Sequence, residues 1–322
     1  MKSKLKIIAL LPFKNEAHNL SAYMKNILKL ADLVIGYDDN SSDNSLKIFK
    51  DLGGLPISFA LEDNFARGGQ YKIRNELLNK GRELGGTHFI VLDADEVFNE
   101  NFTNIGRNFI RQLDFGEVLQ LLWVSCYPDM DHYVSGKSPW APKYHDFIFC
   151  DSKQSYYPKS GLHFGRIPAL SGKRVKVDPK IGAVLHKQFI FKEDFELKQC
   201  LYRMHEFLEG KSSTFAINHT YSITRQGFED ISELPQMWRS NEGFFSSSIS
   251  TWRRDEVRSM LNTHGVRKFQ NLDIWESDFT LSIWRETFKA RNPKVHMKRS
   301  IPVLILIKLL RLIKHKFNSL MQ

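Results

Sequence analysis

The sequence predicts an α/β protein in which a mixed, mostly parallel sheet is flanked by helices. Two observations lead to this fold class. Strand-like apolar runs alternate with amphipathic helical segments along the first third of the chain, and polar or acidic residues follow the predicted strands. In open sheets of this kind ligands bind beyond the carboxyl ends of the strands, so these polar residues are expected to converge there.

The predicted elements follow one another in a regular order. The first helix carries apolar residues at the spacing of one helical face, namely Leu20, Tyr23, Ile27 and Leu30. After the second strand, Ser42 or Asp43 can cap a second helix. In order, the elements are strand 6–11, helix 16–30, a strand, an acidic turn and a helix within 31–53, strand 55–60, a glycine-bracketed helix within 67–86, and strand 89–92.

The fourth strand ends in crowded carboxylates, within the stretch FIVLDADEVF of residues 89–98. Because alternate residues of a strand point the same way, Asp93 and Asp95 are expected to share one side and Glu96 to face the other. Like charges held close raise each other's pKa, so a positive partner is expected, and a hard divalent cation takes oxygen ligands. The alternative is an acidic turn or a helix N-terminus.

The bulk composition is that of a basic globular protein. The net charge of +10 and the isoelectric point near 9.3 favour a polyanionic partner, which can be nucleic acid, anionic lipid or nucleotide phosphate. The cysteines Cys126, Cys150 and Cys200 are far apart in sequence, which indicates a reducing compartment, the cytoplasm, and no disulfide. The N-terminal stretch MKSKLKIIALLPF is expected to form a first strand and not a signal peptide.

The C-terminal stretch at residues 301–317 predicts a basic amphipathic helix. Lys308, Arg311 and His315 form a narrow polar stripe among mostly apolar positions. Such a helix can lie on a membrane surface, and an equally supported alternative is docking on the protein core or on a dimer partner. No stretch of the sequence reaches the ~20 apolar residues that a spanning helix requires.

Four stretches together carry a family resemblance: LLPFKNEAHNL, GYDDNSSDNS, GGQYKIRNELL and FIVLDADEVF, in this order and spacing. They resemble the nucleotide-sugar half of family 2 glycosyltransferases with the Rossmann-like GT-A fold, over residues 5 to 100. The residues that this resemblance implies for the donor are Pro12, Asn15 and Glu16 in the nucleotide pocket, Asp39 at the base with Asp38 beside it, and Arg74, Asn75 and Asp93 near the ribose and diphosphate.

The same resemblance implies a site for Mn²⁺ or Mg²⁺. Asp93 and Asp95 correspond to the family's Asp-x-Asp element, in which Asp95 coordinates the metal directly. His186 in AVLH matches a histidine of members that act on lipopolysaccharide or related glycans, and by analogy it completes the metal site. The alternative is a histidine that only packs the strand end. Asn40 stands where the family usually has glycine, and asparagine tolerates a positive φ.

The catalytic base is where the sequence departs from the family. In those related members a glutamate follows the first histidine, whereas Phe164 follows His163 here. An inverting displacement needs a base within hydrogen-bond reach of the acceptor hydroxyl. The candidates that remain are His163, Asp146 and Asp151, and a sugar-nucleotide-binding protein with weak or lost transfer activity is the alternative.

We therefore expect a metal-dependent, inverting hexosyltransferase of family 2. A divalent ion would neutralise the leaving diphosphate as a Lewis acid, and Arg74 and the helix start at Gly68 and Gly69 can add donors to the phosphates. The donor is expected to be a UDP- or GDP-linked sugar and the acceptor a surface glycan or a glycolipid, in the cytoplasm or on the inner face of the cytoplasmic membrane. Residues 1–215 are predicted to form the catalytic domain and residues 216–322 a mainly helical acceptor-side extension.

Two other function classes fit the sequence less well. A nucleotidyltransferase can use a similar sheet and metal, but it needs a glycine-rich phosphate loop soon after the first strand, and LLPFKNEAHNL contains no glycine. A nucleic-acid-binding protein would account for the basic charge. Its phosphate backbone would be repelled by the acidic strand ends, and no recognised nucleic-acid module is present in the sequence, so we expect no nucleic-acid partner.

Overall fold

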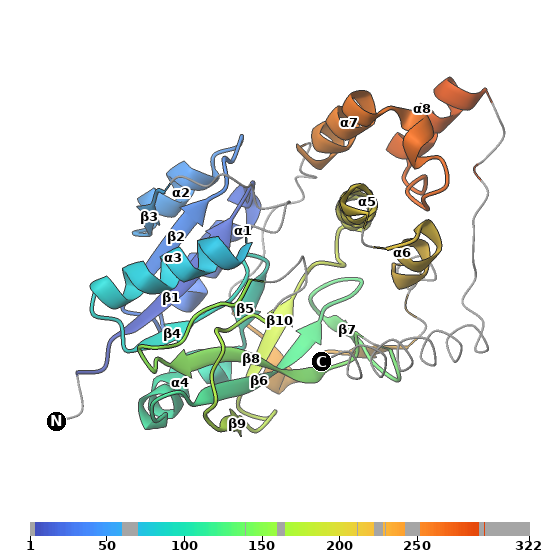
Figure 1. The fold of residues 1–322 in the computed structure, drawn as a ribbon. Helices are drawn as coiled ribbons and strands as arrows, with labels where there is room; N and C mark the ends of the chain where they lie inside the picture. Colours follow the sequence, from blue (N-terminus) through green and yellow to red (C-terminus); the bar gives the residue numbers. More distant parts are fainter. Residues whose placement is uncertain are drawn as a thin grey trace, which may run out of the picture. The chain divides into compact units, whose positions relative to one another are not determined.

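The computed structural model describes residues 4–59, 70–138, 140–159, 165–210, 212–221, 228, 230–241, 252–289 and 293 of the 322-residue chain. The chain divides into two compact units. The first comprises Met1–Lys192 and Glu229–Trp252 and contains the sheets; the second comprises Glu193–Phe228 and Arg253–Gln322, and its described elements are helical (Figure 1). The assignment of residues 1–215 and 216–322 to catalysis and acceptor binding stays a prediction.

The described part of the first unit is built on a nine-stranded sheet with the order β3-β2-β1-β4-β8-β6-β10-β5, in which β9 also pairs with β6. The strands are β1 (Ile7–Phe13), β2 (Leu33–Asp38), β3 (Leu55–Ile57), β4 (His88–Ile90), β5 (Glu96–Phe98), β6 (Val118–Ser125), β8 (Lys143–Cys150), β9 (Arg174–Lys176) and β10 (Ala183–His186). Strands β1 to β4 run parallel, as do the pairs of β6 with β9 and with β10. Strand β8 is antiparallel to β4 and β6, and β5 is antiparallel to β10. The expected fold class, a mixed and mostly parallel sheet, is confirmed.

Helices cover both faces of this sheet. Successive side chains of β1 point to opposite faces, and each set packs against different helices. Ile7, Ala9 and Leu11 pack in one cluster with α1, α2 and α4, whereas Ile8 and Leu10 pack in another with α3. The helices are α1 (Ala17–Ile27), α2 (Ser45–Asp51), α3 (Gln70–Glu83) and α4 (Glu100–Gln112). The sheet is therefore the middle layer of this unit.

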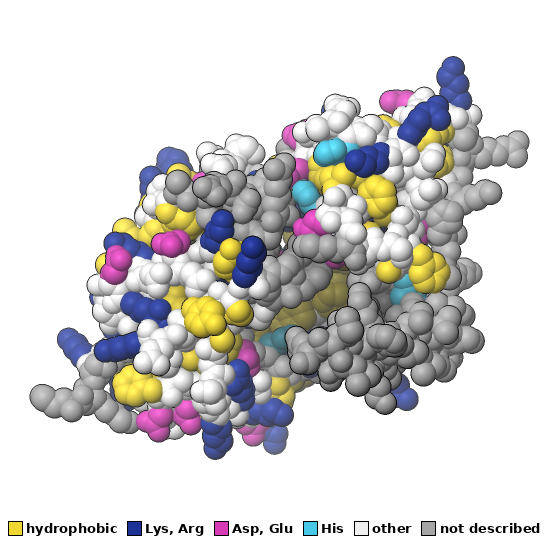
Figure 2. Space-filling model, viewed as in Figure 1, with side chains coloured by type: hydrophobic (Ala, Val, Ile, Leu, Met, Phe, Trp, Pro, Cys, Tyr) yellow, Lys and Arg dark blue, Asp and Glu magenta, His cyan; other side chains and the backbone are white. Residues whose placement is uncertain are grey.

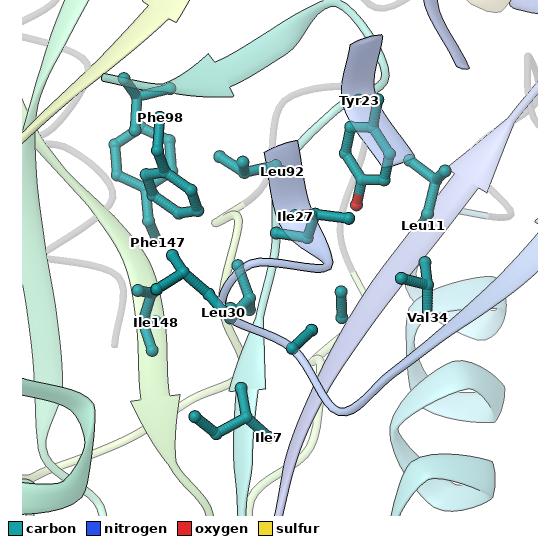
Figure 3. Packing of buried hydrophobic residues seen from close by; sticks show 14 of the residues in the cluster. Ile7, Leu11, Tyr23, Ile27, Leu30, Val34, Leu92, Phe98, Phe147 and Ile148 are labelled. Carbon is teal, nitrogen blue, oxygen red and sulfur yellow. The ribbon is translucent and has the colours of Figure 1, made fainter. Parts of the chain in front are cut away.

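The apolar face predicted for the first helix is confirmed, since Leu20, Tyr23, Ile27 and Leu30 have no exposed surface. Figure 3 shows Tyr23 and Ile27 within the cluster that also contains Phe98 of β5 and Phe147 of β8. The cap predicted for the second helix is corrected. Its N-cap is Asn44, and Asp43 accepts a hydrogen bond from the Ser45 backbone N–H at 2.9 Å.

The described helices of the second unit are α5 (Lys192–Glu209), α6 (Thr214–Thr220), α7 (Trp252–His264) and α8 (Asp278–Phe288), apart from one short 3₁₀ turn. Arg203 of α5 is fully buried and donates a hydrogen bond to the Tyr221 backbone oxygen at 3.0 Å. Ion pairs of Arg253 with Asp194 and of Arg254 with Glu193 join α7 to α5. The helical C-terminal part expected from the sequence is thus present.

A small second sheet in the first unit pairs β7 (His132–Val134) with β11 (Ile231–Glu233). The cysteines Cys126, Cys150 and Cys200 are buried free thiols. Within the described ranges, no helix has the length and apolar character needed to cross a bilayer. The predicted helix at residues 301–317, the candidate base His163 and the Gly68–Gly69 helix start lie outside the described residues.

Candidate functional site

The candidate site lies at the carboxyl edge of β1, β2 and β4. Phe13 at the end of β1 aligns with Asp38 at the end of β2, and the Asp39 backbone N–H donates to the Phe13 oxygen at 2.8 Å. Strand β4 lies parallel to β1 on its other side, so the residues after Ile90 leave the sheet at the same edge. Connections diverge here, with β2 and β3 on one side of β1 and β4 on the other, and such a switch point is where open α/β sheets bind ligands.

Asn15 connects the loop that follows β1 to the loop that follows β2 through hydrogen bonds. Its side-chain oxygen accepts hydrogen bonds from the backbone N–H groups of Ser42 at 2.7 Å and Asp43 at 3.2 Å. Asn15 is buried and has φ +54°, a left-handed conformation that asparagine tolerates. The Glu16 backbone N–H donates to the Ser45 hydroxyl at 2.7 Å. Asn15 therefore shapes the loop at the predicted nucleotide pocket.

The two neighbouring acids at the end of β2, Asp38 and Asp39, have different surroundings. The Asp38 carboxylate accepts from the Ser41 hydroxyl and, at 3.3 Å, from its backbone N–H, which closes a turn. Asp39 is 3% exposed, and the Lys14 ammonium lies 4.0 Å from its Oδ2. Asn40 between them and Ser41 adopts φ +56°. The predicted contact of Asp39 with a nucleobase stays a prediction.

Pro12 and Asn75, two further residues predicted for the donor site, lie in β1 and α3. Pro12 is buried in β1 opposite Tyr37 of β2. The Asn75 side chain donates to the Tyr157 backbone oxygen at 2.9 Å and accepts from its N–H at 2.8 Å. Asn75 thus holds the segment after β8 against α3, a structural task that the sequence pattern did not indicate.

Asp93 lies between two guanidinium groups. Arg74 Nη2 is 3.6 Å from Asp93 Oδ1, and Arg166 Nη2 is 3.5 Å from Oδ2. Burial raises the pKa of the Asp93 carboxyl, but Arg166 and Arg74 outweigh burial and hold this pKa below its ordinary value. The positive partner expected beside the acidic strand end is therefore a pair of arginines, and Asp93 is a carboxylate at neutral pH.

Glu96 forms the buried centre of this cluster, although the sequence predicted that it would face away from Asp93. Its partners Arg166 and Trp123 were not predicted from the sequence. Its carboxylate has no exposed surface and pairs with Arg166 through Nη1–Oε2 at 2.5 Å and Nη2–Oε1 at 2.8 Å. Trp123 Nε1 donates to Oε1 at 2.8 Å, and the Asp93 backbone N–H donates to Oε2 at 2.9 Å. Burial lowers the pKa of Arg166, but the carboxylates of Glu96 and Asp93 outweigh it and raise that pKa, so Arg166 is a permanent cation.

The expected alternation of Asp93 and Asp95 along a strand is wrong. Strand β4 ends at Ile90, β5 begins at Glu96, and the residues between form a turn closed by the Glu96 backbone N–H and the Asp93 oxygen at 3.0 Å. Because the chain turns here, Glu96 reaches the same charged cluster as Asp93 instead of facing away. The acidic-turn alternative describes the backbone correctly.

Asp95 and His186 lie side by side, with 3.3 Å between Oδ2 and Nε2. Strand pairing places them there, since His186 of β10 is opposite Glu96 of β5 and the Lys187 N–H donates to the Asp95 oxygen at 3.2 Å. The His186 ring stacks on Trp123, with centroids 4.7 Å apart. The structure therefore joins two side chains that the sequence predicted as metal ligands, 91 positions apart.

The donor types of this pair fit Mn²⁺ or Mg²⁺, which accept carboxylate oxygen and, for Mn²⁺, imidazole nitrogen. No group of three or more histidine, cysteine or acidic side chains in the described part of the chain is arranged to hold a metal ion. A magnesium-like ion needs only one or two protein carboxylates when substrate phosphates complete its shell. His186 Nδ1 has no hydrogen-bond partner among the described residues, whereas metal-bound histidines ordinarily have one. Asp95 is thus the better-supported ligand.

The candidate bases occupy different places. Asp151 lies at the opposite edge of the sheet, where its backbone N–H donates to the Thr87 oxygen before β4, and Arg82 binds its carboxylate at 2.7 and 2.8 Å. The structure does not bring Asp151 to the edge that carries Asp93 and Asp95, because β8 is antiparallel to β4. Asp146 in β8 accepts from Gln120 Nε2 at 2.7 Å.

No protein-family model matches the chain, and no curated protein matches its sequence. Similar solved structures include mannosyl-3-phosphoglycerate synthase from Rubrobacter xylanophilus, with 16% identity and a TM-score of 0.29 over 41% of this chain and 43% of that one. Glucosyl-3-phosphoglycerate synthase from Mycobacterium tuberculosis, solved with Mn²⁺ and uridine-diphosphate-glucose, has 16% identity and a TM-score of 0.25 over 38% and 45%. A 4-diphosphocytidyl-2C-methyl-D-erythritol synthase has 13% identity and a TM-score of 0.30 over 46% and 76%.

The chain spans less than half the length of the first two of these proteins. The resemblance to these synthases is distant, and likeness at this level assigns neither a family nor an activity.

Proposed function

We propose that this chain is a metal-dependent, inverting glycosyltransferase of family 2 that moves a sugar from a nucleoside diphosphate sugar, UDP- or GDP-linked, to a glycan or lipid-linked acceptor. The observation that carries the proposal is the meeting of the Asp95–His186 pair with Asp93 and its two arginines at the carboxyl edge of the sheet. Carboxylate, imidazole and guanidinium groups together suit a diphosphate and its divalent ion.

Each residue has a task in this proposal. Asp95 and His186 would hold Mn²⁺ or Mg²⁺, which supplies charge neutralisation for the leaving diphosphate. Arg74 would donate hydrogen bonds to the phosphates from α3, since its guanidinium lies 3.6 Å from Asp93 at the surface of the site. Asp39 would accept a hydrogen bond from the base, beside the turn formed by Asp38. Glu96 would keep Arg166 in place through its two-point ion pair.

The base that deprotonates the acceptor is proposed among His163 and Asp146. An inverting displacement requires the base within hydrogen-bond reach of the acceptor hydroxyl. Asp151 is a weaker candidate, because both of its carboxylate oxygens are bound by Arg82 at the far edge of the sheet.

The charges on the face seen in Figure 2 do not favour nucleic-acid binding. Figure 2 shows Lys and Arg side chains scattered over the visible face, with Asp and Glu side chains between them. A nucleic-acid site ordinarily gathers basic residues on one face or along one helix. On this face the described residues form no such continuous basic surface.

The proposed membrane contact rests on the sequence of residues 301–317 alone. Removal of residues 301–322 is expected to reduce co-sedimentation with liposomes that contain anionic lipid, because a basic amphipathic helix binds such surfaces. Unchanged sedimentation of the truncated chain would reject the peripheral membrane assignment and leave the transfer reaction untouched.

The donor site can be tested by thermal unfolding of the full chain with a panel of nucleoside diphosphates, each with and without MnCl₂. A ligand that binds only the native state at a hundredfold its Kd adds about 2.7 kcal/mol of stability. We expect one nucleotide to raise Tm in a Mn²⁺-dependent manner in wild type and to lose this effect in Asp95→Ala. Asp51→Ala is the matched control, since Asp51 is 58% exposed and pairs with Lys47 on the outer surface of α2. No shift with any nucleotide would refute the donor site.

A further inference from the structure

An aromatic cluster adjoins the Asp95–His186 pair on the side of β6 and β8. We define it as Trp123, Trp140, His145, His186 and Phe189. The Trp123 ring stacks on His186 and meets the His145 ring edge-on, with centroids 4.7 and 4.9 Å away. Trp140 lies 6.1 Å from Trp123 and 5.1 Å from Phe189, centroid to centroid. The cluster therefore continues from the proposed metal site along the sheet.

The polar atoms of this cluster are unevenly satisfied. Trp123 Nε1 donates to Glu96. By contrast, Trp140 Nε1, His145 Nε2 and His186 Nδ1 are buried and have no hydrogen-bond partner in the described part of the chain. Buried polar groups are nearly always paired, with protein or with ordered water, so three unpaired atoms in one cluster need a partner from outside the chain, either ordered water or a ligand group. Trp140 and His145 themselves are half-buried, so this part of the cluster reaches the surface.

The chemistry of the cluster matches a sugar ring. Aromatic faces suit the C–H face of a pyranose, and the ring edges need groups that both donate and accept, which hydroxyls do. Burial, followed by Lys143 and Arg166, lowers the pKa of His145 to about 4, so the imidazole is neutral at pH 7 and can pair with a hydroxyl through either tautomer. The Lys143 ammonium lies 5.9 Å above the Trp123 ring on the same strand as His145.

We propose that Trp140 and His145, against the Trp123 ring, form the subsite that binds a neutral sugar ring of the acceptor. That the bound sugar is the acceptor rests on the proposed function. That a sugar ring binds at this cluster does not, because the cluster's rings and unpaired atoms are observed independently of any donor.

The subsite is tested by saturation-transfer NMR on the full chain with the methyl glycosides of glucose, galactose, mannose and N-acetylglucosamine, each alone and with UDP or GDP and MnCl₂. We expect transfer to at least one glycoside. Trp140→Phe keeps a ring and removes the indole N–H, and His145→Phe keeps a ring and removes both nitrogens. Each variant is expected to weaken that glycoside's binding by about tenfold, the effect of one lost hydrogen bond in a desolvated site.

Trp238→Phe is the matched control. Its indole N–H donates to the Pro179 oxygen at 2.8 Å, so its hydrogen bond is made within the protein and its loss is expected to leave the sugar signal unchanged. Equal binding by wild type, Trp140→Phe and His145→Phe would overturn the subsite, as would no transfer to any glycoside. A signal that falls equally in Trp238→Phe would also overturn it, since the effect would then report general destabilisation.

Nucleotide binding to the wild-type chain separates this inference from the proposed function. Sugar binding that depends on Trp140 and His145 without any nucleotide-induced rise in Tm would support the subsite and refute the donor site. A nucleotide-induced rise in Tm together with no sugar binding would support the donor site and refute the subsite.

Discussion

Arg166 and Glu96 form a two-point ion pair at the edge of the sheet, with Nη1–Oε2 at 2.5 Å and Nη2–Oε1 at 2.8 Å. The glutamate has no exposed surface, so its charge is balanced by this arginine and by the N–H donors of Trp123 and Asp93. Parallel hydrogen bonds between guanidinium and carboxylate fix geometry as well as charge. The pair therefore holds the turn that carries Asp93 and Asp95.

Arg166→Met is expected to destabilise the fold by about 3–5 kcal/mol, because it leaves a buried carboxylate without its counter-ion. Urea unfolding measures the change. Arg174→Met is the control, since Arg174 is 38% exposed and its Nε lies 3.8 Å from Asp146, and exposed pairs contribute about 0–1 kcal/mol. Adding Glu96→Gln to Arg166→Met should recover part of the loss. A single variant as stable as the Arg174 control would show that the buried pair is not needed.

Asn75→Ala is expected to destabilise the protein by about 1–3 kcal/mol, because it removes both side-chain bonds to the Tyr157 backbone and leaves a backbone donor unsatisfied. Chemical denaturation is the measurement. Asn79→Ala, one turn later on α3 and exposed, should change stability little. If both variants lose the same stability, the loss comes from the helix and not from the bonds to Tyr157.

Asn40 is expected to accept glycine and to reject a β-branched residue. Its φ of +56° lies in the left-handed region, which costs most L-residues roughly 1–2 kcal/mol, whereas asparagine tolerates it and glycine adopts it freely. Asn40→Val should therefore lower the unfolding free energy by that amount, whereas Asn40→Gly should stay close to wild type. Because the Asn40 side chain is exposed, neither substitution removes buried contacts, and the difference between the two variants reports the backbone conformation. An Asn40→Val variant of wild-type stability would mean that the turn readily adopts another conformation.

Protonation of His145 is expected to lower the free energy of unfolding as the pH drops from about 6.5 to about 4. Its folded pKa of about 4 lies below the ordinary 6.5, so between these values the unfolded chain binds a proton that the folded protein does not. Stability contributed by the neutral form is complete above pH 6.5 and is lost progressively down to pH 4. The charged groups that act on it are Lys143, Arg166, Asp146 and His186.

Urea unfolding of wild type and His145→Phe across this pH range measures that contribution as the difference between the two proteins. Taking the difference removes the titration of the other acids and histidines. We expect the wild type to lose more stability than the variant as pH falls below 6.5. A constant difference across the range would contradict the assignment of the low pKa to His145.

Local patterns in the sequence were enough to predict the parallel half of the sheet and the helices that follow its strands. The period of apolar residues identified the buried face of α1, and acids after apolar runs located the edge where the loops of β1, β2 and β4 meet. Such features depend on neighbours within a few residues along the chain. The family resemblance, in addition, predicted Asp95 and His186 as members of one site, and the two side chains lie 3.3 Å apart.

The rest depended on contacts between distant segments. The antiparallel course of β8 carries Asp151 to the far edge of the sheet, and the pairing of β10 with β5 sets His186 against Asp95. Arg166 is not part of any sequence motif, and it pairs with Glu96 across 70 positions. Glu96 reaches it through a turn, whereas the sequence predicted a continuing strand. Pairing of this kind, between strands or between charges, depends on which surfaces are buried and complementary in the folded chain. Local periodicity in the sequence therefore cannot predict it.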